Sequence, residues 1–114
     1  MTIDAKTYLG KTVKVVIDRP LDSLHPKFGF RYPINYGYIK STRSRDGEEL
    51  DAYVLGAKIP LKEFEGKCIA VIHRLDDDED KLVVVPAERA NLSDEAIVRD
   101  TQFQEKFFKS EIIR

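Results

Sequence analysis

The stretch CIAVIHRLDDDEDKLVVV, from Cys68 to Val85, decides the fold class of this chain. Its two ends, Cys68–Arg74 and Lys81–Val85, are apolar runs rich in β-branched residues, and the acidic segment Leu75–Asp80 joins them. Short apolar runs of this kind are typical of strands that are covered on both faces. The stretch therefore predicts a β-hairpin that is buried on both faces.

Three more strands are predicted before this hairpin. The first is Thr12–Asp18, which ends at Arg19-Pro20. The second is Tyr32–Ile39, in which Pro33 favours a sheet edge or a strand start. The third is Leu50–Leu55, with Leu50, Ala52 and Val54 on one face. Between them, Leu21–Phe30 is interpreted as a loop or a short hairpin, and Lys58–Gly66 as a connector.

The C-terminal part is predicted to be helical. Ser93 is a good N-cap because Asp94 and Glu95 follow it, and Thr101 with Gln104 fits a capping box. The aromatic helix expected after this box carries Phe103, Phe107, Phe108 and Ile112 near one side. Five strands followed by a helical tail predict an α+β, mostly β domain over residues 1–114, built as a small antiparallel barrel or a curled sheet.

Composition excludes several classes of protein. The 114 residues fit one domain, and 19 basic against 20 acidic residues give a net charge of −1, which argues against nucleic-acid or membrane partners. A single cysteine, Cys68, excludes an intramolecular disulfide and a multi-cysteine zinc site. Neither a signal region at Met1–Lys6 nor an apolar run long enough to cross a bilayer is apparent, so a soluble, cytoplasmic protein is expected.

Acidic residues gather in two places. Four of the six residues in Asp46–Asp51 and all five in Asp76–Asp80 are carboxylates. If the two loops meet at one rim of the barrel, their repulsion favours a bound hard cation such as Mg²⁺ or Mn²⁺. The alternative is that both are ordinary solvated turns. A calcium-binding EF-hand loop starting at Asp76 fails, because Lys81 and Ala87 stand where glycine and glutamate are needed.

Four motifs in a fixed order identify a family resemblance. They are IDRP at Ile17–Pro20, YPINYGYI at Tyr32–Ile39, DGEELDAYVLG at Asp46–Gly56 and EDKLVVVP at Glu79–Pro86. Together they resemble the soluble, magnesium-dependent inorganic pyrophosphatases, in a shortened variant. The resemblance implies a five-stranded, OB-like antiparallel barrel with a C-terminal helix, and hydrolysis of pyrophosphate to two orthophosphates by a metal-activated water. It also implies Mg²⁺ as the cofactor, with Mn²⁺ as a second candidate, and a homo-oligomer.

The same resemblance assigns roles to single residues. It places metal ligands at Asp46, Glu48, Asp51 and Glu79, with one further ligand at Asp76 or Asp77, for which we take Asp77. Glu48 is the expected base toward the attacking water, Lys81 and Tyr36 are expected to hold phosphate, and Asp18 stands on the first-strand acid of the family. Lys109 and Arg31 complete the expected substrate-binding residues.

Three departures from the family pattern are present, of which the first concerns the base and the other two thin the phosphate-binding half of the site. Glu48 is longer than the usual aspartate, a cationic hairpin of the family is absent, and Phe108-Lys109 replaces a helical Tyr-Lys pair. His25, Lys27 and Arg31, or Arg19, are the candidates to replace the lost cations. Two alternatives therefore stay open beside the pyrophosphatase: a hydrolase of another small phosphoric anhydride or ester, and a catalytically weakened metal- and phosphate-binding module. A barrel that binds single-stranded nucleic acid is disfavoured by the acidic rim.

Overall fold

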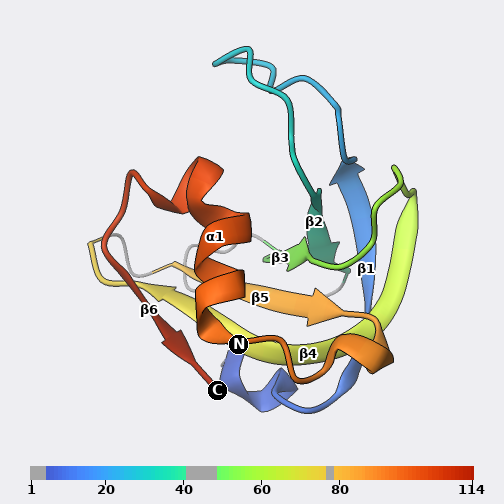
Figure 1. The fold of residues 1–114 in the computed structure, drawn as a ribbon, viewed down its shortest axis with the longest axis vertical. Coiled ribbons are helices and arrows are strands. Elements are labelled where there is room, and N and C mark those ends of the chain that lie inside the picture. The colour runs from blue at the N-terminus through green and yellow to red at the C-terminus, as the bar shows by residue number, and fades with distance from the viewer. Residues whose placement is uncertain (1–4, 41–48, 77–78) are drawn as a thin grey trace.

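The computed structural model describes residues 5–40, 49–76 and 79–114 (Figure 1). In chain order the elements are η1 (Ala5–Tyr8), β1 (Thr12–Arg19), β2 (Asn35–Ile39), β3 (Leu50–Val54), β4 (Glu63–Arg74), β5 (Asp80–Val85), η2 (Ala87–Arg89), α1 (Asp94–Glu105) and β6 (Ser110–Ile113). The elements η1 and η2 are short 3₁₀-helices. No helix among these described residues is long and apolar enough to cross a membrane.

The strands form a closed barrel. The order is β1-β2-β3-β5-β4, and β4 pairs back onto β1 to close it, which confirms the expected five-stranded OB-like barrel with a C-terminal helix. One pair differs from an all-antiparallel arrangement, because β3 and β5 run parallel. The hairpin of β4 and β5 reverses the chain after β3, and this reversal brings β5 alongside β3 in the same direction.

Apolar side chains fill both the interior of the barrel and one outer face. The interior core includes Val15 of β1, Val54 of β3 and Val84 of β5, which are fully buried. The outer core lies under α1 and includes Tyr53 and Ile97. Figure 1 shows α1 lying across the face of β5 and β4. Because β4 and β5 are covered on both sides, the prediction of a doubly buried hairpin is confirmed.

Two strand boundaries differ from the sequence-based prediction by more than one residue. β4 begins at Glu63, inside the predicted connector, because Glu63–Lys67 pairs with β1 and thereby closes the barrel. β2 begins only at Asn35, because the proline at position 33 lacks the N–H that a ladder requires.

The C-terminal part is only half helical. α1 begins as predicted, with the Ser93 hydroxyl accepting a hydrogen bond from the Ala96 N–H at 3.2 Å. The predicted capping box at Thr101 is wrong, because Thr101 lies inside α1 and donates to the Ile97 carbonyl at 2.8 Å. The helix ends at Glu105, and Ile112 belongs to β6, where it pairs with Ile72 of β4. The end of β4 therefore pairs with β6 in a part of the chain where a helix was expected.

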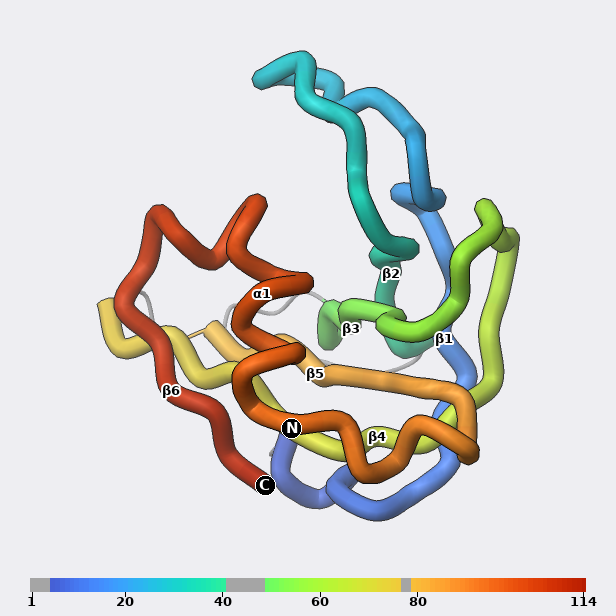
Figure 2. Tube along the Cα trace, in the orientation of Figure 1, coloured from blue at the N-terminus to red at the C-terminus, as the bar shows by residue number. Residues whose placement is uncertain are grey.

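The segment between β1 and β2 is the predicted short hairpin. Leu24 and Arg31 form an antiparallel bridge, and Figure 2 shows this segment standing out from the barrel. Asn35, which is fully buried, anchors its base: its side chain accepts from the N–H groups of Leu21 at 2.9 Å and Leu61 at 3.1 Å, and donates to the Ile59 carbonyl at 2.9 Å.

Replacing Asn35 by alanine is expected to lower the free energy of unfolding by about 2 kcal/mol or more, because two backbone N–H groups and one carbonyl lose their partner. Urea denaturation measures this change. The exposed Asn91 provides the matched control, since Asn91→Ala is expected to stay within about 0.5 kcal/mol of the parent. Equal stability of the two variants would contradict the anchoring role of Asn35.

Candidate active site

Strand pairing brings Tyr36, Asp51 and Lys81 together. Asp51 of β3 is the register partner of Lys81 in the parallel pair with β5, and Tyr36 lies on the neighbouring strand β2. The Lys81 ammonium donates to Asp51 Oδ2 at 2.7 Å and to the Tyr36 hydroxyl at 2.9 Å, and this hydroxyl donates to the same Asp51 oxygen at 2.7 Å. Lys81 is only 4% exposed, and a buried charge needs partners. Asp51 and Tyr36 supply them.

The Tyr36 hydroxyl keeps its proton. Burial raises its pKa well above the ordinary value, and the neighbouring charge of Asp51 raises it further. At neutral pH the hydroxyl is therefore a donor toward Asp51 and an acceptor toward Lys81.

Both acidic stretches contribute a carboxylate to this cluster. Glu79 Oε2 lies 3.7 Å from the Lys81 ammonium and 2.8 Å from the Arg74 guanidinium. Asp51, from the first acidic stretch, and Glu79, from the second, therefore both lie close to the Lys81 ammonium.

Asp18, near the end of β1, lies within electrostatic reach of this cluster. Its pKa is raised mainly by burial; the charge of Arg19 opposes the shift, and the charge of Asp51 adds to it. The charge of Asp51 therefore contributes to the raised pKa of Asp18, but less than burial does.

The donor chemistry of these acids fits a hard divalent cation. Their ligand atoms are carboxylate oxygens, and a cation would relieve the repulsion between Asp18 and Asp51. Within residues 5–40, 49–76 and 79–114, however, no three acidic, histidine or cysteine side chains group closely enough to hold a metal ion by themselves. The expected ligands Asp46, Glu48 and Asp77 lie outside the described residues.

A buried charged network supports the site and was not anticipated from the sequence. Arg74 donates to Glu105 through Nε at 3.1 Å and through Nη2 at 2.8 Å, and the Tyr53 hydroxyl donates to Glu105 at 2.6 Å. Burial works to lower the pKa of Arg74, but its hydrogen bonds to Glu105 and the charge of Glu105 outweigh this and raise it. A sequence signal did exist, because Ile97, Thr101 and Glu105 follow each other at intervals of four on the buried face of α1.

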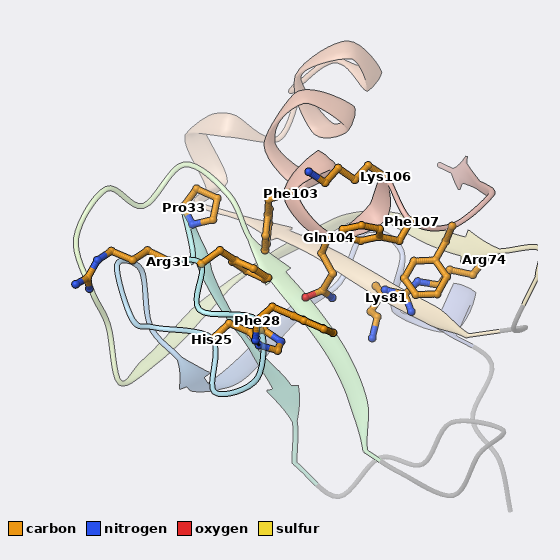
Figure 3. Close-up of a pocket in the computed structure, with 12 residues that line it drawn as sticks. His25, Phe28, Arg31, Pro33, Arg74, Lys81, Phe103, Gln104, Lys106 and Phe107 are labelled. Carbon is orange, nitrogen blue, oxygen red and sulfur yellow. The ribbon is translucent and has the colours of Figure 1, made fainter.

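The other two expected substrate-binding residues, Arg31 and Lys109, make different contacts from Lys81, although Arg31 lines the same cavity. The Arg31 guanidinium donates to the Asp22 carbonyl at 2.9 Å, and Figure 3 shows this side chain extending away from Lys81. Lys109 is exposed, and its backbone N–H contacts the Asp76 carboxylate at 3.2 Å. The expected helical placement of Phe108 and Lys109 is wrong, because α1 ends three residues before Phe108. The Phe108 ring instead covers the Arg74 guanidinium at 3.7 Å.

An open cavity of about 680 Å³ adjoins the cluster (Figure 3). Lys81 and Arg74 line it together with the amide of Gln104 and a set of aromatic side chains. A charged, hydrogen-bonded group therefore borders a space large enough for a small molecule.

Comparisons with known proteins agree with these motifs. A family model described as inorganic pyrophosphatase matches residues 4–112. The inorganic pyrophosphatase of Haemophilus influenzae is 41% identical over 73 residues, covering 60% of this chain and 40% of that protein, and the one from Neisseria meningitidis serogroup A is 41% identical over 76 residues, covering 62% and 42%. The matching segment thus spans about two fifths of these relatives.

Solved structures resemble the fold. An inorganic pyrophosphatase from Ehrlichia chaffeensis superposes with a TM-score of 0.70 at 17% identity, over 90% of this chain and 85% of that one, and shows the fold alone. One from Neisseria gonorrhoeae gives a TM-score of 0.60 at 29% identity, over 80% and 70%.

Proposed function

The chain belongs to the inorganic pyrophosphatase family, and on this premise we propose that it hydrolyses inorganic pyrophosphate to two orthophosphates. The observation that carries the proposal is the cluster of Lys81, Asp51 and Tyr36 beside Glu79, because these four residues stand in three of the family motifs. Such a cluster offers the positive charge of Lys81 to an anion, next to carboxylates that attract a cation.

Lys81 is the proposed phosphate-binding group. An ammonium has three N–H donors, and hydrogen bonds to Asp51 and Tyr36 occupy two of them. We propose that the third donor, which has Glu79 Oε2 at 3.7 Å from the ammonium, donates to a phosphoryl oxygen. Because Tyr36 and Asp51 fix the ammonium before the substrate arrives, little reorganisation is required when charge develops on the phosphoryl oxygens. Tyr36 is the second proposed phosphate-binding residue, and its single O–H, which is donated to Asp51, turns toward the phosphate when the substrate binds.

In the proposed reaction a water oxygen bonds to one phosphorus atom, the bridging P–O bond breaks, and orthophosphate leaves. Glu48 takes the proton of the attacking water. Asp18 is assigned to the same set because it stands on the first-strand acid of the family. The proposed metal ligands are Asp46, Glu48, Asp51, Asp77 and Glu79. Bound there, Mg²⁺, or Mn²⁺ as a second candidate, neutralises substrate charge and lowers the pKa of a water molecule.

Phosphate release in the presence of Mg²⁺ tests the proposal, with pyrophosphate and p-nitrophenyl phosphate compared side by side. Release from pyrophosphate alone, or at a far higher rate, is the expected result, because the monoester lacks the anhydride bond. Preference for the monoester would contradict the proposal. Absence of release from either substrate would favour a metal- and phosphate-binding module.

Millimolar Mg²⁺ or Mn²⁺ is expected to raise the melting temperature by about 4 °C or more. An ion that binds only the folded protein stabilises it by mass action, and about 1 kcal/mol has this effect in a domain of this size. Differential scanning fluorimetry measures the shift. The Asp51→Asn variant is expected to show a smaller shift, and a melting temperature that does not respond to either metal in the parent would contradict the metal site.

The homo-oligomer, which the family resemblance implies, and the cytoplasmic location, which the sequence led us to expect, stay predictions. Light scattering on the purified chain tests the first of them. A monomer at micromolar concentration would contradict it.

A further inference from the structure

The cavity beside Lys81 has two aromatic walls that come from distant parts of the chain. The short hairpin between β1 and β2 supplies the first wall, with His25, Phe28 and Phe30. The end of α1 and the segment after it supply the second wall, with Phe103, Phe107 and Phe108. Its volume of about 680 Å³ falls within the range of sites for small organic ligands. An inorganic pyrophosphate ion has no apolar surface that could use these walls.

The outermost ring of each wall is exposed. Phe28 is 69% exposed and Phe107 is 68% exposed, and both line the same cavity (Figure 3). Large apolar side chains that gather around one exposed concavity mark a binding site more often than an ordinary surface. These two rings are therefore available to a ligand.

The first wall is held in place before any ligand arrives. The His25 ring stacks on Phe28 with a centroid distance of 4.9 Å. His25 Nδ1 accepts hydrogen bonds from the backbone N–H groups of Lys27 at 3.1 Å and Phe28 at 3.0 Å. Phe30 then contacts Phe103 of α1 edge to face at 6.0 Å, which links the two walls. Binding therefore requires little ordering of this wall.

Positive charge accompanies the aromatic surface. Lys27 lies 5.7 Å from the centre of the Phe28 ring, and Lys106 lies 5.3 Å from the centre of the Phe107 ring. Lys81 and Arg74 line the same cavity. The cavity thus combines planar apolar surfaces with cations, which complements a ligand that has an aromatic part and an anionic part.

We propose that this cavity binds the base of a nucleoside polyphosphate, whose phosphoanhydride group lies at Lys81. The inference rests on the proposed function in taking Lys81 as the group that binds the anhydride. Every nucleobase has a π face that stacks on exposed phenylalanine rings, and such stacking strengthens binding by about 5- to 150-fold for each base. The base therefore uses the surface that free pyrophosphate leaves in water.

Two ligands that differ only in the adenosine group test this inference. They are imidodiphosphate and adenosine 5′-(α,β-imido)diphosphate, in which a P–N–P bridge replaces the anhydride oxygen and prevents its hydrolysis. Calorimetric titration in Mg²⁺ gives both dissociation constants. We expect the adenosine compound to bind at least about tenfold more tightly.

Two variants test whether the tighter binding of the adenosine compound comes from the aromatic walls. Phe28→Ala and Phe107→Ala are each expected to remove most of the difference between the two ligands and to leave the affinity for imidodiphosphate unchanged. Both side chains are exposed, so the fold does not depend on them. Ile59→Ala truncates another exposed apolar side chain that does not line the cavity, and it serves as the control.

Equal affinity for the two ligands, no binding of either one, or an undiminished difference in both phenylalanine variants would overturn the inference. These outcomes are distinguishable from a failure of the proposed function, because that function is measured by phosphate release from pyrophosphate in a separate assay. A chain that binds the adenosine compound tightly but does not hydrolyse pyrophosphate would retain this inference and lose the proposed function.

Discussion

Replacing Lys81 by alanine is expected to lower kcat/KM for pyrophosphate by about 100-fold, the usual effect of losing one preorganised donor. The ammonium is held by Asp51 at 2.7 Å and Tyr36 at 2.9 Å, so it meets a phosphoryl oxygen without reorganisation. The Arg31 guanidinium is hydrogen-bonded to the Asp22 carbonyl, so Lys81 is expected to carry a large share of the phosphate binding. Steady-state kinetics of phosphate release measure the change.

Two further variants show whether the loss of activity in Lys81→Ala is specific to the Lys81 ammonium. Lys81→Arg is expected to restore activity only in part, because a planar guanidinium does not reproduce the compact ammonium between Asp51 and Tyr36. Lys58→Ala removes an exposed lysine from the loop after β3 and is expected to leave activity unchanged. Wild-type rates in a folded Lys81→Ala protein would reduce Lys81 to a counter-ion of the acidic residues and would favour the binding module.

Replacing Glu105 by alanine is expected to lower the free energy of unfolding by about 3–5 kcal/mol, because it leaves a buried cation with too few partners. Arg74 and Glu105 are each 4% exposed, and Glu105 accepts two hydrogen bonds from Arg74 and one from the Tyr53 hydroxyl. Glu79 accepts from Nη1 of Arg74, so it is not expected to replace the bonds that Nε and Nη2 make to Glu105. Urea denaturation measures the loss.

The charge and the hydrogen bonds of Glu105 can be separated. Glu105→Gln keeps an acceptor and a similar volume, so it is expected to cost less than Glu105→Ala. Glu88→Ala, which removes an exposed carboxylate from η2, is the matched control and is expected to change stability by less than about 0.5 kcal/mol. A loss below about 1 kcal/mol for Glu105→Ala would contradict the supporting role of this network.

The strands of the barrel could be predicted from local sequence because their side chains carry the signal. β-Branched runs located β1 and the β4–β5 hairpin, and the alternation of Leu50, Ala52 and Val54 located β3. Ser93 located the start of α1. Prediction failed where pairing overrode local preference. Glu63–Gly66 has a connector-like sequence but joins β1 to close the barrel, and Ile112 follows an aromatic pattern but pairs with Ile72. An unpaired strand edge stabilises a strand that local propensity does not favour.

The chemical character of the site was determined by the sequence, and its assembly by the tertiary structure. The motifs name Asp51, Glu79, Lys81 and Tyr36 as residues of one function, since each stands in a family motif. Only the parallel pairing of β3 with β5 brings Asp51 next to Lys81, which is 30 residues away in the chain. Likewise, Arg74 meets Glu105, and Phe28 shares a cavity with Phe107, only because α1 lies against the outer face of the barrel. Residue types fix which interactions are possible, whereas backbone pairing and burial decide which side chains lie within a few ångströms of one another.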